Sequence, residues 1–217
     1  MNILVEFFGR VILSIYTFTS DYGLAIVILT LIVRLMLLPV SIKQKKQAEK
    51  QVELVEEMEE IKKKYRKDKS RQEEALRELY AKKGIGGGAC FTSLAQFPIM
   101  ICLYNAIRSI SALECGTIIL PWITSLLGRD PYFLLPLATI VIQMLPQLYP
   151  HLRMFRDIHF QKVDGKMILV MTVMNAMFII MIPSGVGLYY LVSGAFTAAE
   201  QFIYYWIRSL RLKTSNV

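Results

Sequence analysis

The chain has 217 residues, of which 54% are apolar and 19% are charged, and its formal net charge is +8. An ordinary soluble domain is about 45–50% apolar and about 25% charged. The apolar residues gather in runs of roughly twenty, the length that crosses about 30 Å of hydrocarbon as a helix. This composition excludes a single soluble α/β enzyme, a disordered chain and a secreted disulfide scaffold. It predicts an all-α membrane protein.

Residues 1–20 are predicted to form an amphipathic helix in the membrane interface. Apolar side chains recur at helical spacing from Phe7 to Phe18, beside the polar Glu6 and Arg10. A secretory signal peptide is not expected, because the stretch lacks a basic start and an A-x-A cleavage site. An imperfect additional membrane span is the alternative.

Five apolar stretches follow, and each predicts a transmembrane helix. The first is assigned to residues 21–42, with its apolar part from Tyr22 to Val40. Pro183, Ser184 and Gly185 predict a tight turn between the last two spans, because proline and glycine favour turns. The other four spans are assigned to residues 90–107, 132–149, 167–182 and 186–207.

The basic residues predict the orientation of these spans. We assign three segments to one side of the membrane: residues 43–84, the loop 150–166 and the short basic tail 208–217. Together they contain 21 of the 25 Lys and Arg residues. Lys and Arg near span ends stay in the cytoplasm. We therefore expect a multi-pass protein of the plasma or inner membrane, with its N-terminus outside and its C-terminus in the cytoplasm.

The cytoplasmic segment 43–84 predicts a helical hairpin. It is rich in Glu, Lys, Arg and Gln, which are good helix formers, and it carries two thin apolar stripes. The polar run from Arg66 to Ser70 separates the two arms, and the first arm is the longer. Gly84 to Gly88 then predicts a flexible joint rather than a phosphate-binding loop, because no Gly-Lys-Ser/Thr follows a strand.

The sequence contains no recognisable catalytic or metal-binding pattern. It has no nucleophile elbow, no HExxH pair and no glycine-rich nucleotide fingerprint. His151 and His159 are the only histidines, and neither has a cysteine or acidic partner at ligand spacing. We therefore expect a protein that is not an enzyme and uses no cofactor, metal or nucleotide.

Arg34 is the most informative residue, because it lies deep in the first apolar stretch. A buried arginine costs about 2.5–3.5 kcal/mol on insertion scales unless it is solvated or paired. Snorkelling to the cytoplasmic interface is one interpretation. Lys43 lies about 13 Å further along the axis, however, which is a long reach for a guanidinium. A hydrated cavity around Arg34 is the favoured interpretation, and Thr30 lies on the same face one turn earlier.

Further polar residues occur inside the predicted spans. Any one of them alone is better explained as ordinary hydrogen bonding between membrane helices, worth about 0.6 kcal/mol. Together with Arg34 they predict a groove that holds water. Glu200 is either a partner of Arg34 or an interfacial acid, and Tyr190 is either an interfacial belt residue or part of the groove. The polar residues are Gln96, Asn105, Gln143, Gln147, Asn175, Ser193, Glu200 and Gln201.

The order of several short motifs resembles the YidC/Oxa family of membrane protein insertases. The resemblance implies five transmembrane helices that form a groove open to the cytoplasm and to lipid and closed on the outside. It also implies that Arg34 is the family's intramembrane arginine and that four further groove positions join Thr30. The motifs are Leu35–Pro39 before the charged hairpin, Cys90 with Gln96–Ile99, Asp130–Tyr132 with Pro136, and Pro183–Gly185 with Leu188–Tyr190. The four groove positions are Gln96, Phe97, Met100 and Tyr190.

The sequence therefore predicts an insertase that moves newly made membrane proteins into the lipid bilayer without nucleotide hydrolysis. Its expected substrate-binding groove includes Arg34, Gln143 and Glu200, and its hairpin would recruit the ribosome or the Sec translocon. A small-solute transporter or channel is the alternative, although no inverted repeat is detected. A purely structural assembly factor is a third possibility, and it would not need Arg34.

Overall fold

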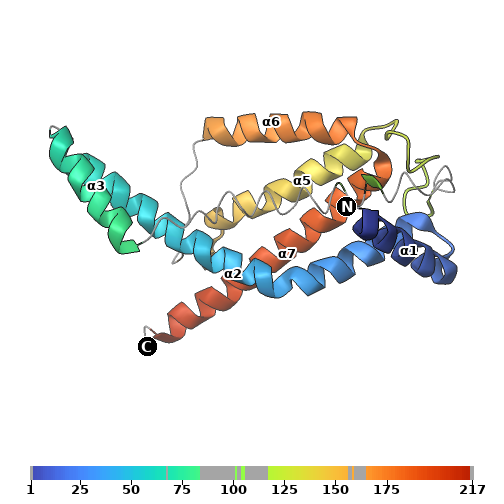
Figure 1. The fold of residues 1–217 in the computed structure, drawn as a ribbon, viewed down its shortest axis with the longest axis horizontal. Helices are drawn as coiled ribbons and strands as arrows, with labels where there is room; N and C mark the ends of the chain where they lie inside the picture. Colours follow the sequence, from blue (N-terminus) through green and yellow to red (C-terminus); the bar gives the residue numbers. More distant parts are fainter. Residues whose placement is uncertain are drawn as a thin grey trace. The chain divides into compact units, whose positions relative to one another are not determined.

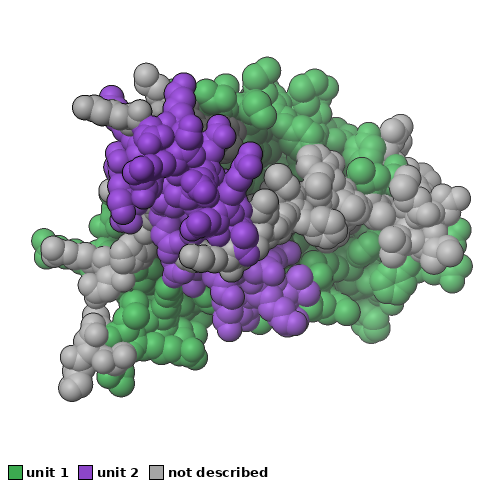
Figure 2. All heavy atoms as spheres, turned by 60° about the vertical axis from the view of Figure 1, so that its left-hand side comes forward, with its two compact units in different colours: residues 1–38, 97–158, 162–217 green, residues 39–96, 159–161 purple. Residues whose placement is uncertain are grey.

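The computed structural model describes residues 2–66, 68–83, 101, 104–105, 117–155, 158 and 165–215, and all regular structure in these ranges is helical. The chain divides into two compact units, which Figure 2 colours separately. The first unit contains residues 1–38, 97–158 and 162–217, and the second contains residues 39–96 and 159–161. The mostly helical fold agrees with the all-α prediction.

Figure 1 shows the order of the helices along the chain. Within the described ranges, residues 101, 104 and 105 are helical and belong to the predicted second span, most of which lies outside those ranges. Two short 3₁₀ helices, η2 (Tyr149–His151) and η3 (Arg153–Phe155), follow α5. The α-helices are α1 (Asn2–Thr19), α2 (Tyr22–Lys64), α3 (Lys69–Lys83), α5 (Leu134–Leu148), α6 (Gly165–Met181) and α7 (Ser184–Ser215).

Helix α2 contains 43 residues, and its range includes both the predicted first span and the start of the predicted hairpin. Pro39 lies inside the helix, where it removes one backbone hydrogen bond without ending it. The residues on both sides explain this, because the leucines before Pro39 and the Lys, Gln and Glu residues after it are strong helix formers.

Helix α7 also extends further than the predicted fifth span. It continues to Ser215, so the described part of the expected tail is helical. Arg208, Arg211 and Lys213 favour this extension, because basic side chains interact well with the negative end of the helix dipole.

Among the described residues, only α2 is both long and apolar enough to cross a membrane by length and composition. Its most apolar stretch of 18 residues has a mean hydropathy of 2.5. The stretch Ile168–Met181 in α6 is apolar but shorter. The full set of five spans therefore remains a prediction.

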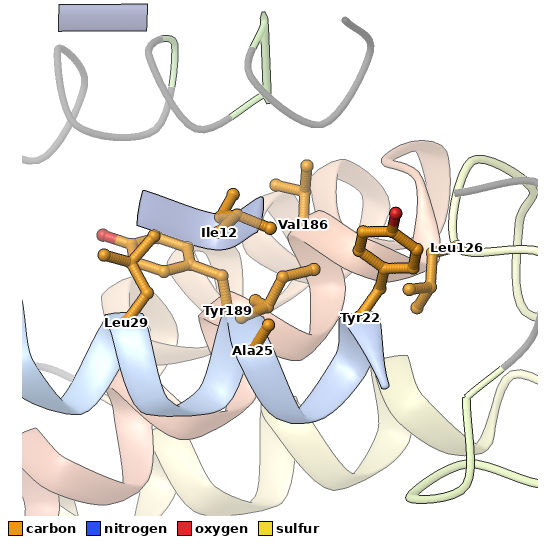
Figure 3. Close-up of a cluster of buried hydrophobic side chains, with 8 residues drawn as sticks. Ile12, Tyr22, Ala25, Leu29, Leu126, Val186 and Tyr189 are labelled. Carbon is orange, nitrogen blue, oxygen red and sulfur yellow. The ribbon is translucent and has the colours of Figure 1, made fainter. Parts of the chain in front are cut away.

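Two apolar clusters hold the first unit together. In the larger cluster, Ile12 from α1 and four residues at the start of α2 pack against α7 and a loop, as Figure 3 shows. Tyr16 and Tyr22 stack with their ring centroids 4.0 Å apart at the junction of α1 and α2. The other members of this cluster are Tyr22, Ala25, Ile26, Leu29, Leu126, Val186 and Tyr189, and the smaller cluster contains Leu120, Ile123, Leu135 and Leu188.

Helix α5 packs against both α7 and α6. Gly187 on α7 allows the first of these contacts to be close, because a Cβ atom there would lie 2.9 Å from the Leu135 side chain. A Cβ atom at Gly194 would lie 3.4 Å from Gln143 Cγ, which is an ordinary contact. Only Ile182 and Pro183 lie between α6 and α7.

In the second unit, the later part of α2 and helix α3 interact through side chains. The Tyr80 hydroxyl lies 3.3 Å from Met58 Sδ, and Gln72 Nε2 donates to the Lys62 carbonyl oxygen at 3.3 Å. Asp68 begins α3, because its carboxylate accepts from the Arg71 backbone N–H at 3.2 Å. The side-chain contacts between α2 and α3 hold this unit together.

Candidate functional site

Arg34 lies on the part of α2 that belongs to the first unit, and its side chain is partly buried. Its Nε donates a hydrogen bond to the Ser193 hydroxyl oxygen on α7 at 2.7 Å, and a terminal guanidinium nitrogen contacts the same oxygen. Ser193 is only 2% exposed. The fold therefore holds the Arg34 guanidinium against a buried hydroxyl of helix α7.

Thr30 lies one turn before Arg34, about 6 Å along the helix axis. Its side chain is 2% exposed, and its hydroxyl donates to the Ile26 carbonyl oxygen at 2.6 Å. This hydroxyl is thus satisfied within its own helix, as is common for threonine in apolar surroundings. Thr30 lies in the packed region beside Arg34.

Gln143 projects from α5 toward two neighbouring helices. Its Cγ lies beside Gly194 on α7, next to Ser193. Its Oε1 accepts a hydrogen bond from Asn175 Nδ2 on α6. Two polar contacts therefore lie between helices of the first unit: Arg34–Ser193 joins α2 to α7, and Gln143–Asn175 joins α5 to α6. We call these four residues the polar level.

A cavity of about 100 Å³ lies between α5 and α6, next to the Gln143–Asn175 hydrogen bond. A water molecule occupies about 30 Å³ in the liquid and needs two to four polar partners. This cavity is large enough for a few waters and has suitable partners. Its lining consists of Ile140, Gln143, Met144, Gln147, Thr172 and Asn175.

The remaining predicted site residues have different surroundings. The Tyr190 ring makes edge-to-face contacts with Tyr189 and with Phe178 of α6, at centroid distances of 5.7 and 6.1 Å. Glu200 is partly buried on α7, about 10 Å along the axis from Ser193. Gln96, Phe97 and Met100 lie outside the described residues.

The sequence analysis missed a buried carboxylate at the start of α2. Asp21 is 6% exposed and accepts hydrogen bonds from the Leu24 N–H at 2.7 Å, the Thr117 hydroxyl at 2.7 Å and the Ile118 N–H at 2.6 Å. Burial alone raises the pKa of Asp21, but these hydrogen bonds outweigh it and hold the pKa below its ordinary value. An Asp directly before an apolar run is an N-cap signal that could have identified it.

An aromatic cluster holds the segment after α5 against α7. Phe155 is fully buried, and its ring lies 5.6 Å from Phe202, 6.2 Å from Tyr149 and 6.3 Å from Tyr205, measured between ring centroids. The Tyr149 hydroxyl donates to the Ala198 carbonyl oxygen at 2.9 Å. These contacts fix the path of the chain where it leaves α5.

Known proteins can be aligned with nearly the whole length of this chain. Residues 14–210 match the family model described as 60Kd inner membrane protein. A membrane protein insertase YidC from Geotalea daltonii is 30% identical over 88% of the chain, and one from Wolinella succinogenes is 35% identical over 86%. The chain spans only 35% and 34% of the lengths of these two relatives.

A YidC insertase from Caldanaerobacter subterraneus is closer in length, being 27% identical over 94% of this chain and 95% of its own. The fold is also similar to a crystal structure of an active YidC insertase with its first transmembrane domain resolved. That match has a TM-score of 0.65 and 29% identity, and it covers 90% of this chain and 44% of the other. The chain therefore belongs to the 60Kd inner membrane protein family, the YidC/Oxa family that its sequence resembles.

Proposed function

We propose that this chain is a membrane protein insertase that moves newly synthesised membrane proteins into the lipid bilayer. The observation that supports this proposal most is the position of Arg34, which Ser193 holds in the apolar stretch of a helix long enough to cross a membrane. A charged side chain in an apolar span is costly and is usually retained for a function. The YidC relatives are described as insertases, which supports the same activity here.

The proposed architecture has five transmembrane helices, built on α2, the segment 90–107, α5, α6 and α7. The N-terminus lies outside and the C-terminus in the cytoplasm, and α1 lies in the interface. The distribution of Lys and Arg supports this orientation, because basic residues remain on the cytoplasmic side.

The proposed groove opens to the cytoplasm and to lipid, and its polar surface includes Arg34, Gln143 and Glu200. A polar segment of a substrate would otherwise cross about 30 Å of hydrocarbon. A hydrated groove shortens this dry path. The polar level and the cavity between α5 and α6 support the proposal, because both supply hydrogen-bonding groups within apolar helices.

Arg34 attracts acidic residues of the translocating segment, and this attraction is stronger in a medium of low dielectric constant than in water. The Ser193 hydroxyl orients the guanidinium without itself neutralising its positive charge. The apolar helix of the substrate then partitions into lipid, and its burial in hydrocarbon drives release. This sequence of steps requires no nucleotide, cofactor or catalytic residue.

The second unit is proposed to recruit the ribosome, the Sec translocon or the substrate on the cytoplasmic side. Exposed charged residues cover its two helices, including Lys62, Lys63, Arg71 and Glu74. A surface of mixed charge favours polar partners and binding that depends on salt.

Reconstitution into liposomes tests the proposed function. Insertion of a small membrane protein with an acidic outer tail is measured by protease protection, with the parent chain, Arg34→Ala and Arg34→Lys. We expect Arg34→Ala to lower insertion by an order of magnitude and Arg34→Lys to restore part of it. Arg129→Ala, which removes an exposed arginine, is the matched control. Equal insertion by Arg34→Ala would contradict the charge role, and solute flux without insertion would favour a transporter.

A further inference from the structure

Residues 117–130 contact the N-terminal ends of three helices in the first unit. At α2, the Asp21 carboxylate accepts hydrogen bonds from the Thr117 hydroxyl and from the Ile118 N–H. The fit is close, because a Cβ atom at Gly23 would lie only 2.1 Å from Thr117 Oγ1. Only glycine therefore leaves room for the segment to lie against the first turn of α2.

The same segment holds the start of α7. The Gly128 carbonyl oxygen accepts from both the backbone N–H and the hydroxyl of Ser184, at 2.8 and 2.9 Å. The Leu126 carbonyl oxygen accepts from the Gly185 N–H at 2.8 Å. These bonds satisfy N–H groups that every helix leaves without an intrahelical partner in its first turn.

The segment also reaches α5, which carries neither Arg34 nor Ser193. Asp130 accepts from the Tyr132 N–H at 3.0 Å and from the Leu135 N–H at 2.6 Å. One stretch of 14 residues thus holds the beginnings of three helices by hydrogen bonds that are buried or partly buried.

Helix α2 carries Arg34 and helix α7 carries Ser193. Each helix is unbroken between that residue and the helix start that residues 117–130 contact. Arg34 lies about 18 Å along α2 from Tyr22, and Ser193 lies about 14 Å along α7 from Ser184. A slip of one residue between the helices would move a side chain by about 1.5 Å and rotate it by about 100°. Such a slip exceeds what a hydrogen bond tolerates.

We propose that residues 117–128 form a register clamp that fixes α2 against α7, so that Arg34 meets Ser193. Asp21 and Thr117 are its positioning residues, because they act on the polar level only through the helix they hold. This proposal describes how Arg34 is positioned, and it does not depend on the proposed insertase function.

A distance measurement between spin labels tests the clamp directly. The three natural cysteines, Cys90, Cys102 and Cys115, are replaced by serine. Labels are then attached at Leu35→Cys and Ala195→Cys, two exposed positions next to Arg34 and close to Ser193. Pulsed electron resonance of the protein in lipid nanodiscs gives the distribution of distances between the labels.

Four variants are compared with the parent chain in this measurement. Asp21→Ala and Thr117→Val remove the carboxylate and the hydroxyl of the clamp, and each is expected to shift or broaden the distance distribution. Thr117→Ser keeps a hydroxyl and should restore the parental distribution. Asp130→Ala removes hydrogen bonds at α5 only and is the matched control, so its distribution should remain parental.

The clamp is contradicted if Asp21→Ala and Thr117→Val melt at lower temperature but keep the parental distribution, because Asp21 would then be a structural cap only. It is equally contradicted if Asp130→Ala alters the distribution as much as Thr117→Val does. Should Asp21→Ala fail to fold, the pair Thr117→Val and Thr117→Ser still decides the question.

Discussion

The Arg34 guanidinium donates to the hydroxyl of Ser193, a residue 159 positions further along the chain. The bond joins the first long apolar helix to the last one, and Ser193 is almost completely buried. A hydrogen bond from a charged donor is worth about 1.5–3 kcal/mol, roughly twice the value for a neutral pair. It therefore fixes the position of the guanidinium as well as adding stability.

Removing the Ser193 hydroxyl should weaken the orientation of Arg34 while keeping its charge. We expect Ser193→Ala to reduce insertion of substrates with acidic tails several-fold and to lower the melting temperature in detergent. Substrates with neutral tails should be affected less. The two insertion rates, measured side by side in liposomes, provide this comparison.

Thr197→Val is the matched control, because the Thr197 hydroxyl bonds the Ser193 carbonyl oxygen on the same helix and not Arg34. If Ser193→Ala lowered the insertion of substrates with acidic tails and with neutral tails equally, the Ser193 hydroxyl would contribute to stability alone.

The sequence predicted Arg34 and its helix because a single charge in an apolar run is visible without any tertiary information. It also suggested that Ser193, Gln143 and Asn175 lie among apolar helices. It could not pair Arg34 with Ser193 or Gln143 with Asn175, because such pairs depend on the axial register and rotation of helices far apart in the chain. Gly187 illustrates the problem, since it lets α5 approach α7 and no local pattern shows this.

Contacts between distant segments could not be predicted from the sequence. The sequence placed the end of the first apolar span near Val40, where the composition changes from apolar to charged, and the range of helix α2 includes this point. The Asp21 cap could have been recognised from its position before Tyr22. Its partner Thr117 could not, because no local pattern connects two residues that are 96 positions apart in the chain.

The hydrogen bond between Gln143 and Asn175 joins α5 to α6. Asn175→Leu removes it and fills part of the adjacent cavity with an apolar side chain. Because side-chain hydrogen bonds between membrane helices average about 0.6 kcal/mol, we expect only a small fall in stability. Unfolding in mixed micelles measures it.

Met174→Leu, at an exposed neighbouring position of α6, is the control for the introduced leucine. A loss of several kcal/mol in Asn175→Leu, absent from Met174→Leu, would mean that the polar level carries much more of the stability than a single hydrogen bond supplies.

Phe155 is the centre of the aromatic cluster, and its truncation should be costly. Replacing a fully buried phenylalanine by alanine typically costs about 3–5 kcal/mol, because it removes apolar contacts and leaves a cavity. Phe155→Ala should therefore unfold at a clearly lower denaturant concentration and expose residues 149–155 to protease. Leu152→Ala, at an exposed position in the same segment, should retain the parental behaviour.

The pH dependence of stability should reflect Asp21. Because folding lowers its pKa from the ordinary value of 3.8, the carboxylate adds stability above that value and loses it as the pH falls through the lowered pKa. The difference in unfolding free energy between the parent and Asp21→Asn should stay constant from about pH 7 to 5 and shrink toward about pH 3. If the difference in unfolding free energy instead grew as the pH fell, folding would raise the pKa of Asp21, which contradicts this prediction.

Hydration from one side only is the central claim, and thiol labelling tests it most directly. In the chain without natural cysteines, Gln147→Cys and Gln143→Cys, two positions that line the cavity between α5 and α6, are exposed to a membrane-impermeant thiol reagent added to one side of oriented vesicles. We predict that reagent on the cytoplasmic side labels the thiol at position 147, that the deeper position 143 reacts more slowly, and that reagent outside labels neither. Labelling of both positions from outside, or of neither from the cytoplasm, would contradict the account.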